Sequence, residues 1–275
     1  MRSGTIPSTG EELPVIGLGT WQTFDVTDAA AARAPLRTVL QEFAAAGAKV
    51  VDSSPMYGRS EQVVGDLVRE LDLRSRLFVA TKVWTRGRQA GIDQMNQSMR
   101  LLRVDQIDLM QVHNLLDART HLDTLRGWKA DGRVRYIGLT HYTSRGAEEI
   151  ADLLTTEDGI DFVQINYSPE ERDAERRLFP MVLERGIAVL ANRPLGGDSN
   201  RLMSRLSRRA IPGWANEIDC TTWPQIILKF VVSHPAVTCA IPATRNPEHL
   251  RDNLEAGSGR LPDESLREAI AAAIG

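Results

Sequence analysis

The chain has 275 residues, 42% of them apolar, and a formal net charge of −3. That length and apolar content suffice for one large domain with a substantial core, and the interspersed acidic and basic residues give no electrostatic case for nucleic acid or a membrane surface as a partner. Two cysteines are too few for a disulfide framework or a zinc site, no apolar run is long enough to span a bilayer, and residues 1–10 lack the apolar core of a signal peptide. We therefore expect a cytoplasmic protein without a metal.

Short apolar runs alternate along the chain with segments of helical spacing. The runs lie near residues 15–18, 48–51, 77–80, 107–112, 134–139, 161–165, 187–190 and 237–241. Between them apolar residues recur with the period of a helix, as in Leu36, Val39, Leu40 and Phe43 ahead of Gly47. Ser60 is the predicted N-cap of the second helix. Eight such runs separated by helices favour a closed (β/α)8 barrel, a single domain over residues 1–275, rather than an open sheet.

Two segments depart from the regular alternation. Residues 4–13 precede the first predicted barrel strand. We expect them to form a small hairpin that closes the floor of the barrel. A longer insertion follows Leu190 and contains Gly196-Gly197, an arginine-rich stretch and an apolar helix over residues 226–232. Because long insertions in such barrels usually sit beside the active site, we expect this one at the barrel mouth.

Four titratable residues gather near the ends of the early strands. Asp52, Lys82 and His113 each follow or end an apolar run, and Tyr57 lies on the loop after Asp52. Because chemistry collects at the carboxyl ends of parallel strands, these side chains are expected to converge. An ammonium beside Tyr57 would lower its pKa from ~10 and free its proton for a carbonyl oxygen, Asp52 would hold Lys82, and neutral His113 would orient the carbonyl. The chain offers no other reductant, which points to a nicotinamide cofactor.

The sequences around these residues resemble those of the aldo-keto reductases. Asp52-Ser53-Ser54-Pro55-Met56-Tyr57-Gly58 looks like the family's aspartate–tyrosine signature, and Ser60-Glu61 and Gly65 continue it. The further motifs that fall in family order are Thr81-Lys82-Val83-Trp84, Gln111-Val112-His113, Ile137-Gly138-Leu139, residues 163–169, Arg193-Pro194-Leu195-Gly196 and Ile241-Pro242-Ala243-Thr244-Arg245. The resemblance covers residues 16 to about 256.

The resemblance implies an oxidoreductase that reduces aldehydes or ketones with NADPH, NADH being possible, and that uses Asp52, Tyr57, Lys82 and His113 as catalytic residues. It implies a cofactor extended across the barrel mouth, and no GxGxxG motif follows any predicted strand. The cofactor-binding positions that it implies are Gly19, Thr20, Trp21, Asp52, Thr140, His141, Gln164, Asn192, Arg193, Pro194, Leu195, Gly196, Ile241, Pro242, Ala243, Thr244, Arg245, His249 and Asn253. Arg245, at the start of a predicted helix, suits the 2′-phosphate.

Large aromatic residues are the candidates for a substrate pocket beside Tyr57 and His113. The predicted pocket residues are Trp21, Phe24, Tyr57, Trp84, His113 and Trp214. The chain ends soon after the eighth predicted helix and lacks the long tail that closes the pocket in many longer relatives. We therefore expect an open site for small carbonyl compounds, in a protein that is a monomer or a weak homo-oligomer.

Three departures from the family pattern leave alternatives open. His141 stands where the family usually has asparagine, and Asn192-Arg193 stand where an aromatic residue often stacks on the nicotinamide. Ala243 and His249 occupy positions where a cation often assists the 2′-phosphate, so the preference for NADPH over NADH stays open.

One alternative function is a nucleotide-binding redox sensor or regulatory subunit with little turnover. Another is a different barrel enzyme, such as a sugar isomerase or a metal-dependent hydrolase. That second alternative would need clustered metal ligands, which five scattered histidines do not provide.

Overall fold

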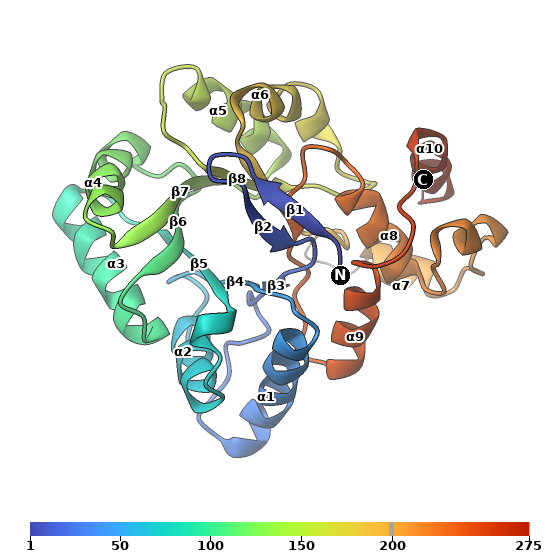
Figure 1. Ribbon diagram of the computed structural model, residues 1–275, viewed down its shortest axis with the longest axis horizontal. Coiled ribbons are helices and arrows are strands. Elements are labelled where there is room, and N and C mark those ends of the chain that lie inside the picture. The colour runs from blue at the N-terminus through green and yellow to red at the C-terminus, as the bar shows by residue number, and fades with distance from the viewer. Residues whose placement is uncertain (198–200, 275) are drawn as a thin grey trace.

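Eight parallel strands form one curled sheet in the computed structural model, which describes residues 1–197 and 201–274 (Figure 1). In chain order, which is also their order in the sheet, they are β3 (Leu18–Gly19), β4 (Val50–Asp52), β5 (Phe78–Val83), β6 (Ile107–His113), β7 (Val134–Thr140), β8 (Phe162–Asn166), β9 (Ala188–Asn192) and β10 (Cys239–Ala240). Bridges from Ile16 to Ala240 and from Gly19 to Ala243 join the first strand to the last and close the barrel. The predicted (β/α)8 barrel is confirmed, and each predicted run overlaps one strand.

A helix follows each barrel strand and packs outside it (Figure 1). These helices are α1 (Ala30–Ala45), α2 (Ser60–Glu70), α3 (Arg88–Leu102), α4 (Ala118–Ala130), α5 (Ser144–Leu154), α6 (Leu178–Arg185), α8 (Trp223–Val232) and α9 (Pro247–Glu255). The short 3-10 helices are η1 (Arg74–Arg76), η2 (Asp173–Glu175) and η3 (Gly213–Ile218). The helical spacing in α1 reflects burial, since Leu36, Val39, Leu40 and Phe43 have no exposed surface.

The predicted N-cap at Ser60 was wrong by one residue. Helix α2 begins at Ser60, and Arg59 holds the N-cap position without a side-chain cap of its own. The distant Asp25 accepts a hydrogen bond from the Arg59 N–H at 3.0 Å, while the Ser60 hydroxyl turns away and donates to Thr20 O at 3.4 Å. A contact across the fold has therefore replaced the local cap that the sequence suggested.

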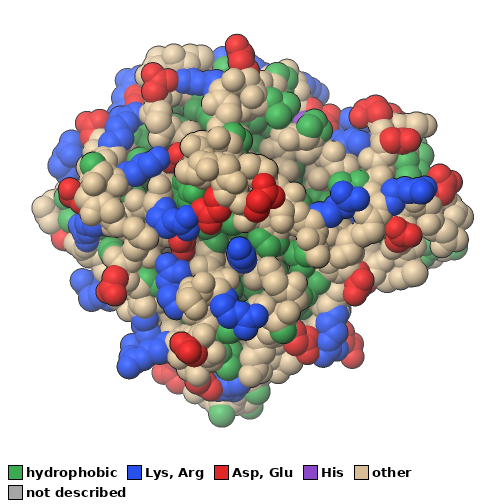
Figure 2. All heavy atoms as spheres, viewed as in Figure 1, with side chains coloured by type: hydrophobic (Ala, Val, Ile, Leu, Met, Phe, Trp, Pro, Cys, Tyr) green, Lys and Arg blue, Asp and Glu red, His purple; other side chains and the backbone are tan. Residues whose placement is uncertain are grey.

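An antiparallel hairpin of β1 (Ser3–Ile6) and β2 (Glu11–Pro14) covers the amino-terminal end of the barrel, as predicted (Figure 1). Ile6 and Leu13 have no exposed surface and belong to the apolar cluster inside the barrel that also contains Phe78. Glu11 fixes the hairpin by accepting hydrogen bonds from Tyr136 Oη at 2.7 Å and from Arg135. Figure 2 shows positive and negative side chains interspersed over this face. The barrel is thus closed by apolar packing at this end, and polar side chains line the other.

The insertion after β9 contains α7 (Arg201–Leu206), η3 and α8, whose apolar helix was predicted. Its residues 198–200, like residue 275, lie outside the described part of the chain. The arginine-rich stretch is tied to α10 (Glu264–Ile274), because Arg205 donates to Ile274 O at 2.5 Å and Arg209 to Ala273 O at 2.6 Å. Cations stabilise the carbonyl end of a helix, so these contacts hold α10 against the barrel. None of the described helices combines the length and apolarity needed to cross a bilayer.

The close packing of α2 on α3 depends on Gly65. A Cβ atom at this position would lie 2.0 Å from Leu101 O and 2.8 Å from Leu102 backbone atoms, so the helices would have to separate. We expect Gly65→Ala to lower the free energy of unfolding by roughly 1–3 kcal/mol, the usual range for overpacking, in urea denaturation. The matched control is Gly127→Ala in α4, where a Cβ meets nothing within 4 Å. That change should raise stability by about 0.5–1 kcal/mol, and a stabilising Gly65→Ala would contradict the packing argument.

Candidate active site

A buried ion pair between Lys82 and Asp52 occupies the carboxyl end of the barrel interior. Lys82 Nζ donates to Asp52 Oδ1 at 2.8 Å, to Asp52 Oδ2 at 2.7 Å and to the backbone oxygen of Ser53 at 2.7 Å. The exposed fraction is 1% for Lys82 and 2% for Asp52. Burial lowers the pKa of Lys82, but Asp52 and Tyr57 outweigh it and raise that pKa above its ordinary value. Lys82 therefore stays a cation inside the barrel.

Two glutamines complete the surroundings of Asp52. Gln111 Nε2 lies 3.3 Å from Asp52 Oδ1, and Gln164 Nε2 lies 3.2 Å from Asp52 Oδ2. The two amides are joined, since Gln111 Nε2 also donates to Gln164 Oε1 at 2.7 Å. Sequence reasoning gave Gln111 no role of its own. Its position in the barrel interior could have been predicted, however. Residues two apart in a strand share a face of the sheet, and Gln111 lies two residues before His113.

Glu61 links α2 to the strand that carries Lys82. This carboxyl group is 1% exposed and accepts a hydrogen bond from Thr81 Oγ1 at 2.6 Å. Burial raises its pKa, against the opposing hydrogen bonds of Thr81 and Ser98 and the charge of Lys82. The Ser60-Glu61 motif thus fixes the position of β5 rather than entering the barrel interior.

Tyr57 lies beside the ion pair, with Lys82 Nζ 5.1 Å from the centre of its ring. Its ring meets that of His113 edge-on, with the ring centres 6.2 Å apart. We expected Lys82 to lower the pKa of Tyr57, and its charge does act in that direction, but the net pKa of Tyr57 is raised. Burial raises that pKa and outweighs the lowering effects of Lys82 and Arg193. Tyr57 therefore keeps its proton at neutral pH, which is the state that a proton donor requires.

His113, the last residue of β6, is 5% exposed and is held neutral at physiological pH. Burial, together with the positive charge of Lys82 and the neighbouring His141, lowers the pKa of His113 to about 3. Its ring centre lies 6.5 Å from that of Trp84, and Nδ1 lies 3.2 Å from Ser54 Oγ. The structure thus brings Asp52, Tyr57, Lys82 and His113 into one site, as the sequence predicted.

The predicted cofactor positions lie along the same edge of the barrel. They occupy the carboxyl ends of β3, β7, β8 and β9, the segment after β10, and helix α9. The hydroxyl oxygen of Thr20, which is fully buried, lies 2.9 Å from Asp52 O and 3.0 Å from Ser53 Oγ and can donate its one proton to either. Arg245 is exposed and stands just ahead of α9, whose N-cap Asn246 accepts from Glu248 N–H at 2.9 Å.

Arg193 spans the mouth between two aromatic rings. Its guanidinium carbon lies 5.8 Å from the centre of the Trp21 ring and 5.1 Å from that of Tyr142. Its φ of +49° is uncommon for a residue other than glycine and turns the chain sharply at the end of β9. Tyr142 was not among the predicted residues, and its contact with Arg193 depends on the tertiary fold.

Two of the predicted pocket aromatics stand open at the mouth. The exposed fractions are 36% for Trp21 and 41% for Trp84. Gln94 holds Trp84 in place through the backbone, since Trp84 N–H donates to Gln94 Oε1 at 2.5 Å and Gln94 Nε2 donates to Trp84 O at 3.2 Å. Trp214 lies in η3 and packs against the main core, and its role in the pocket stays a prediction.

The prediction of Phe24 as a pocket residue was wrong. Phe24 has no exposed surface and belongs to the core cluster outside the barrel strands that also contains Leu36 and Val63. A tight turn, in which Phe24 N–H donates to Thr20 O at 3.1 Å, directs the ring inward. Burying this apolar ring is favourable, and its sequence position next to the mouth did not reveal that direction.

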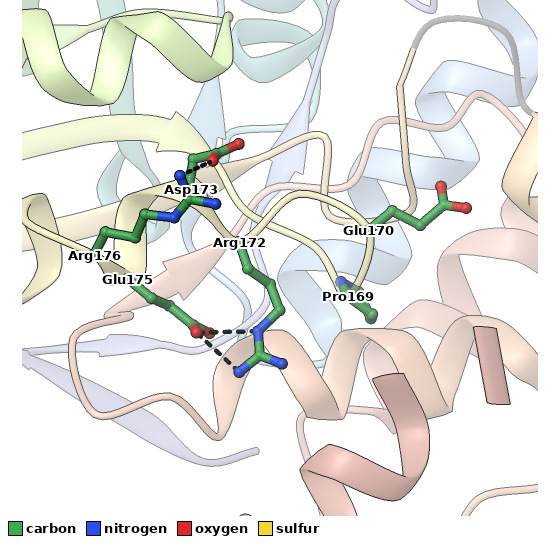
Figure 3. A pocket seen from close by; sticks show the side chains of 6 residues that line it. All are labelled: Pro169, Glu170, Arg172, Asp173, Glu175 and Arg176. Carbon is green, nitrogen blue, oxygen red and sulfur yellow. Dashed lines mark hydrogen bonds and ion pairs between the residues drawn. The ribbon is translucent and has the colours of Figure 1, made fainter. Parts of the chain in front are cut away.

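A cavity of about 450 Å³ lies away from the predicted site, at the segment between β8 and α6 (Figure 3). Its lining residues are Pro169, Glu170, Arg172, Asp173, Glu175 and Arg176. The charges pair with one another: Arg172 with Glu175 at 2.9 Å and Arg176 with Asp173 at 3.5 Å (Figure 3). Since no predicted site residue lines it, the candidate active site is defined by the geometry at the barrel mouth. In the described ranges 1–197 and 201–274, no cluster of three or more potential ligands could hold a metal ion.

The barrel and its polar mouth define a (β/α)8 protein with a tyrosine–lysine–aspartate–histidine site. The sequence profile of the Aldo/keto reductase family matches residues 15–273. The chain therefore belongs to the aldo/keto reductase family.

Similar proteins of known sequence and structure agree with this assignment. The aldose reductase of Encephalitozoon cuniculi is 25% identical over 96% of this chain and 91% of its own length. The methylglyoxal reductase YeaE of Escherichia coli (strain K12) is 26% identical over 92% of this chain and 89% of its own. The crystal structure of an aldo/keto reductase from Klebsiella pneumoniae in complex with NADP and acetate aligns with a TM-score of 0.80. It is 27% identical and covers 98% of this chain and 94% of its own.

The neutral state of His113 has a consequence for stability. Its pKa is about 3 in the folded chain against 6.5 for an unperturbed histidine, so the unfolded chain binds more protons between these values. The free energy of unfolding is therefore retained above pH 6.5 and lost as the pH falls toward 3.

We expect His113→Asn to reduce the slope of the free energy of unfolding against pH, by up to about 1.4 kcal/mol per pH unit between pH 6 and 4. Urea denaturation of both proteins across this range measures the difference. His234, whose pKa is lowered to about 4, is present in both proteins, so its contribution to the pH dependence cancels in the comparison. Equal pH dependence in the two proteins would show that His113 is not held neutral by burial.

Proposed function

We propose that the chain reduces aldehydes or ketones to alcohols with NADPH, and that Tyr57 is the proton donor. The observation that carries this proposal is the convergence of a protonated tyrosine, a buried ammonium and a neutral imidazole at the barrel mouth. The names of relatives, an aldose reductase and a methylglyoxal reductase, support carbonyl reduction. The NADP complex of the structural relative from Klebsiella pneumoniae supports the choice of cofactor.

Each side chain of the site has a separate role in the proposed reaction. A nicotinamide held at the mouth would supply the hydride for the carbonyl carbon. Tyr57 donates its phenolic proton to the carbonyl oxygen as negative charge develops there. Lys82, fixed by Asp52, stabilises the phenolate that Tyr57 becomes, and His113 donates a hydrogen bond to the same oxygen. Trp21 and Trp84, both partly exposed at the mouth, would supply apolar contacts to the substrate.

The residues at the mouth fit the proposed cofactor. Asn192 Oδ1 is buried at the end of β9 without a hydrogen-bond partner among the described residues, and a carboxamide N–H would satisfy it. Gln164, which the family resemblance would place at the carboxamide together with Thr140 and His141, already binds Gln111 and Asp52. Arg245 is exposed and forms no ion pair within the described chain, so its guanidinium is available to the 2′-phosphate. Thr140 and His141 would complete the nicotinamide surroundings.

The substitution Tyr57→Phe removes the proposed proton donor and preserves the ring that packs against His113. We expect kcat for carbonyl reduction to fall roughly 10²- to 10⁴-fold, the usual contribution of general acid catalysis, with the dissociation constant for NADPH nearly unchanged. Steady-state NADPH oxidation and tryptophan fluorescence measure the two quantities.

The matched control for this experiment is Tyr136→Phe, which removes a phenol hydroxyl at the opposite end of the barrel, beside Glu11. That variant should turn over like the wild type. Wild-type turnover by Tyr57→Phe would remove the tyrosine from the mechanism. Tight nucleotide binding without turnover in the wild type would favour the alternative of a redox-sensing or regulatory subunit.

Replacing Arg245→Ala tests the proposed 2′-phosphate site. Loss of a charge-assisted hydrogen bond costs about 1.5–3 kcal/mol, so we expect NADPH to bind roughly 10- to 100-fold more weakly and NADH to bind almost unchanged. Fluorescence titration with each nucleotide provides the comparison. Arg251→Ala, in the helix α9 that follows Arg245 but paired with Glu42 at 2.6 Å, is the control that should leave both affinities intact. Equal losses for NADPH and NADH in Arg245→Ala would refute the assignment.

A further inference from the structure

Ser54 is a fully buried serine that touches the histidine of the site. Its Oγ lies 3.2 Å from His113 Nδ1, and the same oxygen accepts a hydrogen bond from Met56 N–H at 3.3 Å. A hydroxyl group has one proton to donate and can accept two. Because Met56 already supplies a donor, the hydroxyl proton of Ser54 remains to be placed, and His113 Nδ1 is its one acceptor among the described residues.

The tautomer of His113 decides how this contact is satisfied. A neutral imidazole carries one proton, on either Nδ1 or Nε2. If Nδ1 carried it, Ser54 Oγ would receive two donors and its own buried proton would have no acceptor. If Nδ1 is the acceptor, the Met56 N–H, the Ser54 hydroxyl and the imidazole are all satisfied on this side. The hydrogen-bond pattern therefore favours a proton on Nε2.

We propose that Ser54 is a positioning residue that holds His113 in the Nε2–H tautomer, so that Nε2 is the atom that donates to the substrate carbonyl oxygen. No described residue binds Nε2, and the centre of the imidazole ring lies 6.2 Å from that of Tyr57 and 6.5 Å from that of Trp84. The inference rests on the proposed function for its catalytic consequence, but the tautomer itself does not.

A serine at this position has a simple chemical advantage. Without a donor at Nδ1, the two tautomers of a buried neutral imidazole differ little, and a fraction of the molecules would present a lone pair to the carbonyl oxygen. Two acceptors facing each other repel, so that fraction would not assist the reaction. By donating to Nδ1, Ser54 removes this unproductive fraction of molecules. Its own position is fixed by Met56 N–H in the turn after Asp52, so the imidazole ring is held in place as well.

The test is ¹⁵N NMR of histidine-labelled protein at pH 7 without nucleotide or substrate, with His113→Asn used to assign the signal. We expect the wild type to show a protonated Nε2 and an unprotonated Nδ1. Ser54→Ala should give a mixture of tautomers, and Ser54→Cys, which keeps a weak donor of similar size, should restore part of the Nε2–H form. A protonated Nδ1 in the wild type would overturn the proposal outright, whatever the variants do.

Kinetics then test the consequence. We expect kcat for carbonyl reduction to fall roughly three- to tenfold in Ser54→Ala and less in Ser54→Cys, with the affinity for NADPH unchanged, as for one lost neutral hydrogen bond. The control is Ser233→Ala, which deletes a serine hydroxyl that bonds Phe230 O at 2.9 Å at the end of α8 and should retain wild-type kcat. Wild-type kcat in Ser54→Ala would overturn the role of Ser54. Absence of turnover in the wild type would instead overturn the proposed function, and the NMR result would still decide the tautomer.

Discussion

The ion pair of Lys82 and Asp52 is the interaction on which the rest of the site depends. Two charges that are almost completely removed from water cost several kcal/mol each unless partners replace the lost hydration. The barrel supplies these partners from four strands: the pair itself from β4 and β5, Gln111 from β6 and Gln164 from β8. The contacts of Gln111 and Gln164 with Asp52 join strands that are not neighbours and require the sheet to curl, so the charge pair and the barrel stabilise each other.

This constraint divides the barrel interior into two layers. Toward the hairpin the interior is filled by apolar side chains such as Phe78, Phe162 and Leu13, which need no polar partner. Toward the mouth it holds the ion pair and the two amides, in which nearly every donor has an acceptor. The polar layer is therefore confined to the end where a substrate can reach it, and the apolar layer keeps water from entering through the floor.

Burial also sets the protonation states around the pair. It raises the pKa of Tyr57 and lowers that of His113, so both groups are neutral beside the Lys82 cation. The positive charge of Lys82 opposes the first shift and supports the second. In both cases desolvation is the largest influence, and the site consequently holds a phenol and an imidazole that can each donate a hydrogen bond.

The sequence predicted those features that depend on local patterns. Alternating apolar runs and helical stripes predicted the barrel, and strand-end positions predicted that Asp52, Lys82 and His113 would meet. Features set by tertiary packing were missed. The inward turn of Phe24, the cap on Arg59 N–H from distant Asp25, and the sign of the pKa shift of Tyr57 all depend on how much of each group is buried. Gln111 was predictable only in part. Strand periodicity shows that its side chain faces the barrel interior, but its hydrogen bond to Gln164 depends on tertiary packing.

The central claim is that this site transfers hydride from a nicotinamide to a carbonyl carbon. The most direct measurement incubates the protein with NADPH that carries deuterium at both C4 positions, together with a panel of small aldehydes and ketones, and analyses the alcohols by mass spectrometry. The account predicts one deuterium on the former carbonyl carbon, with one nucleotide oxidised for each alcohol formed. Saturable binding of NADPH with no deuterated alcohol from any member of the panel would contradict it.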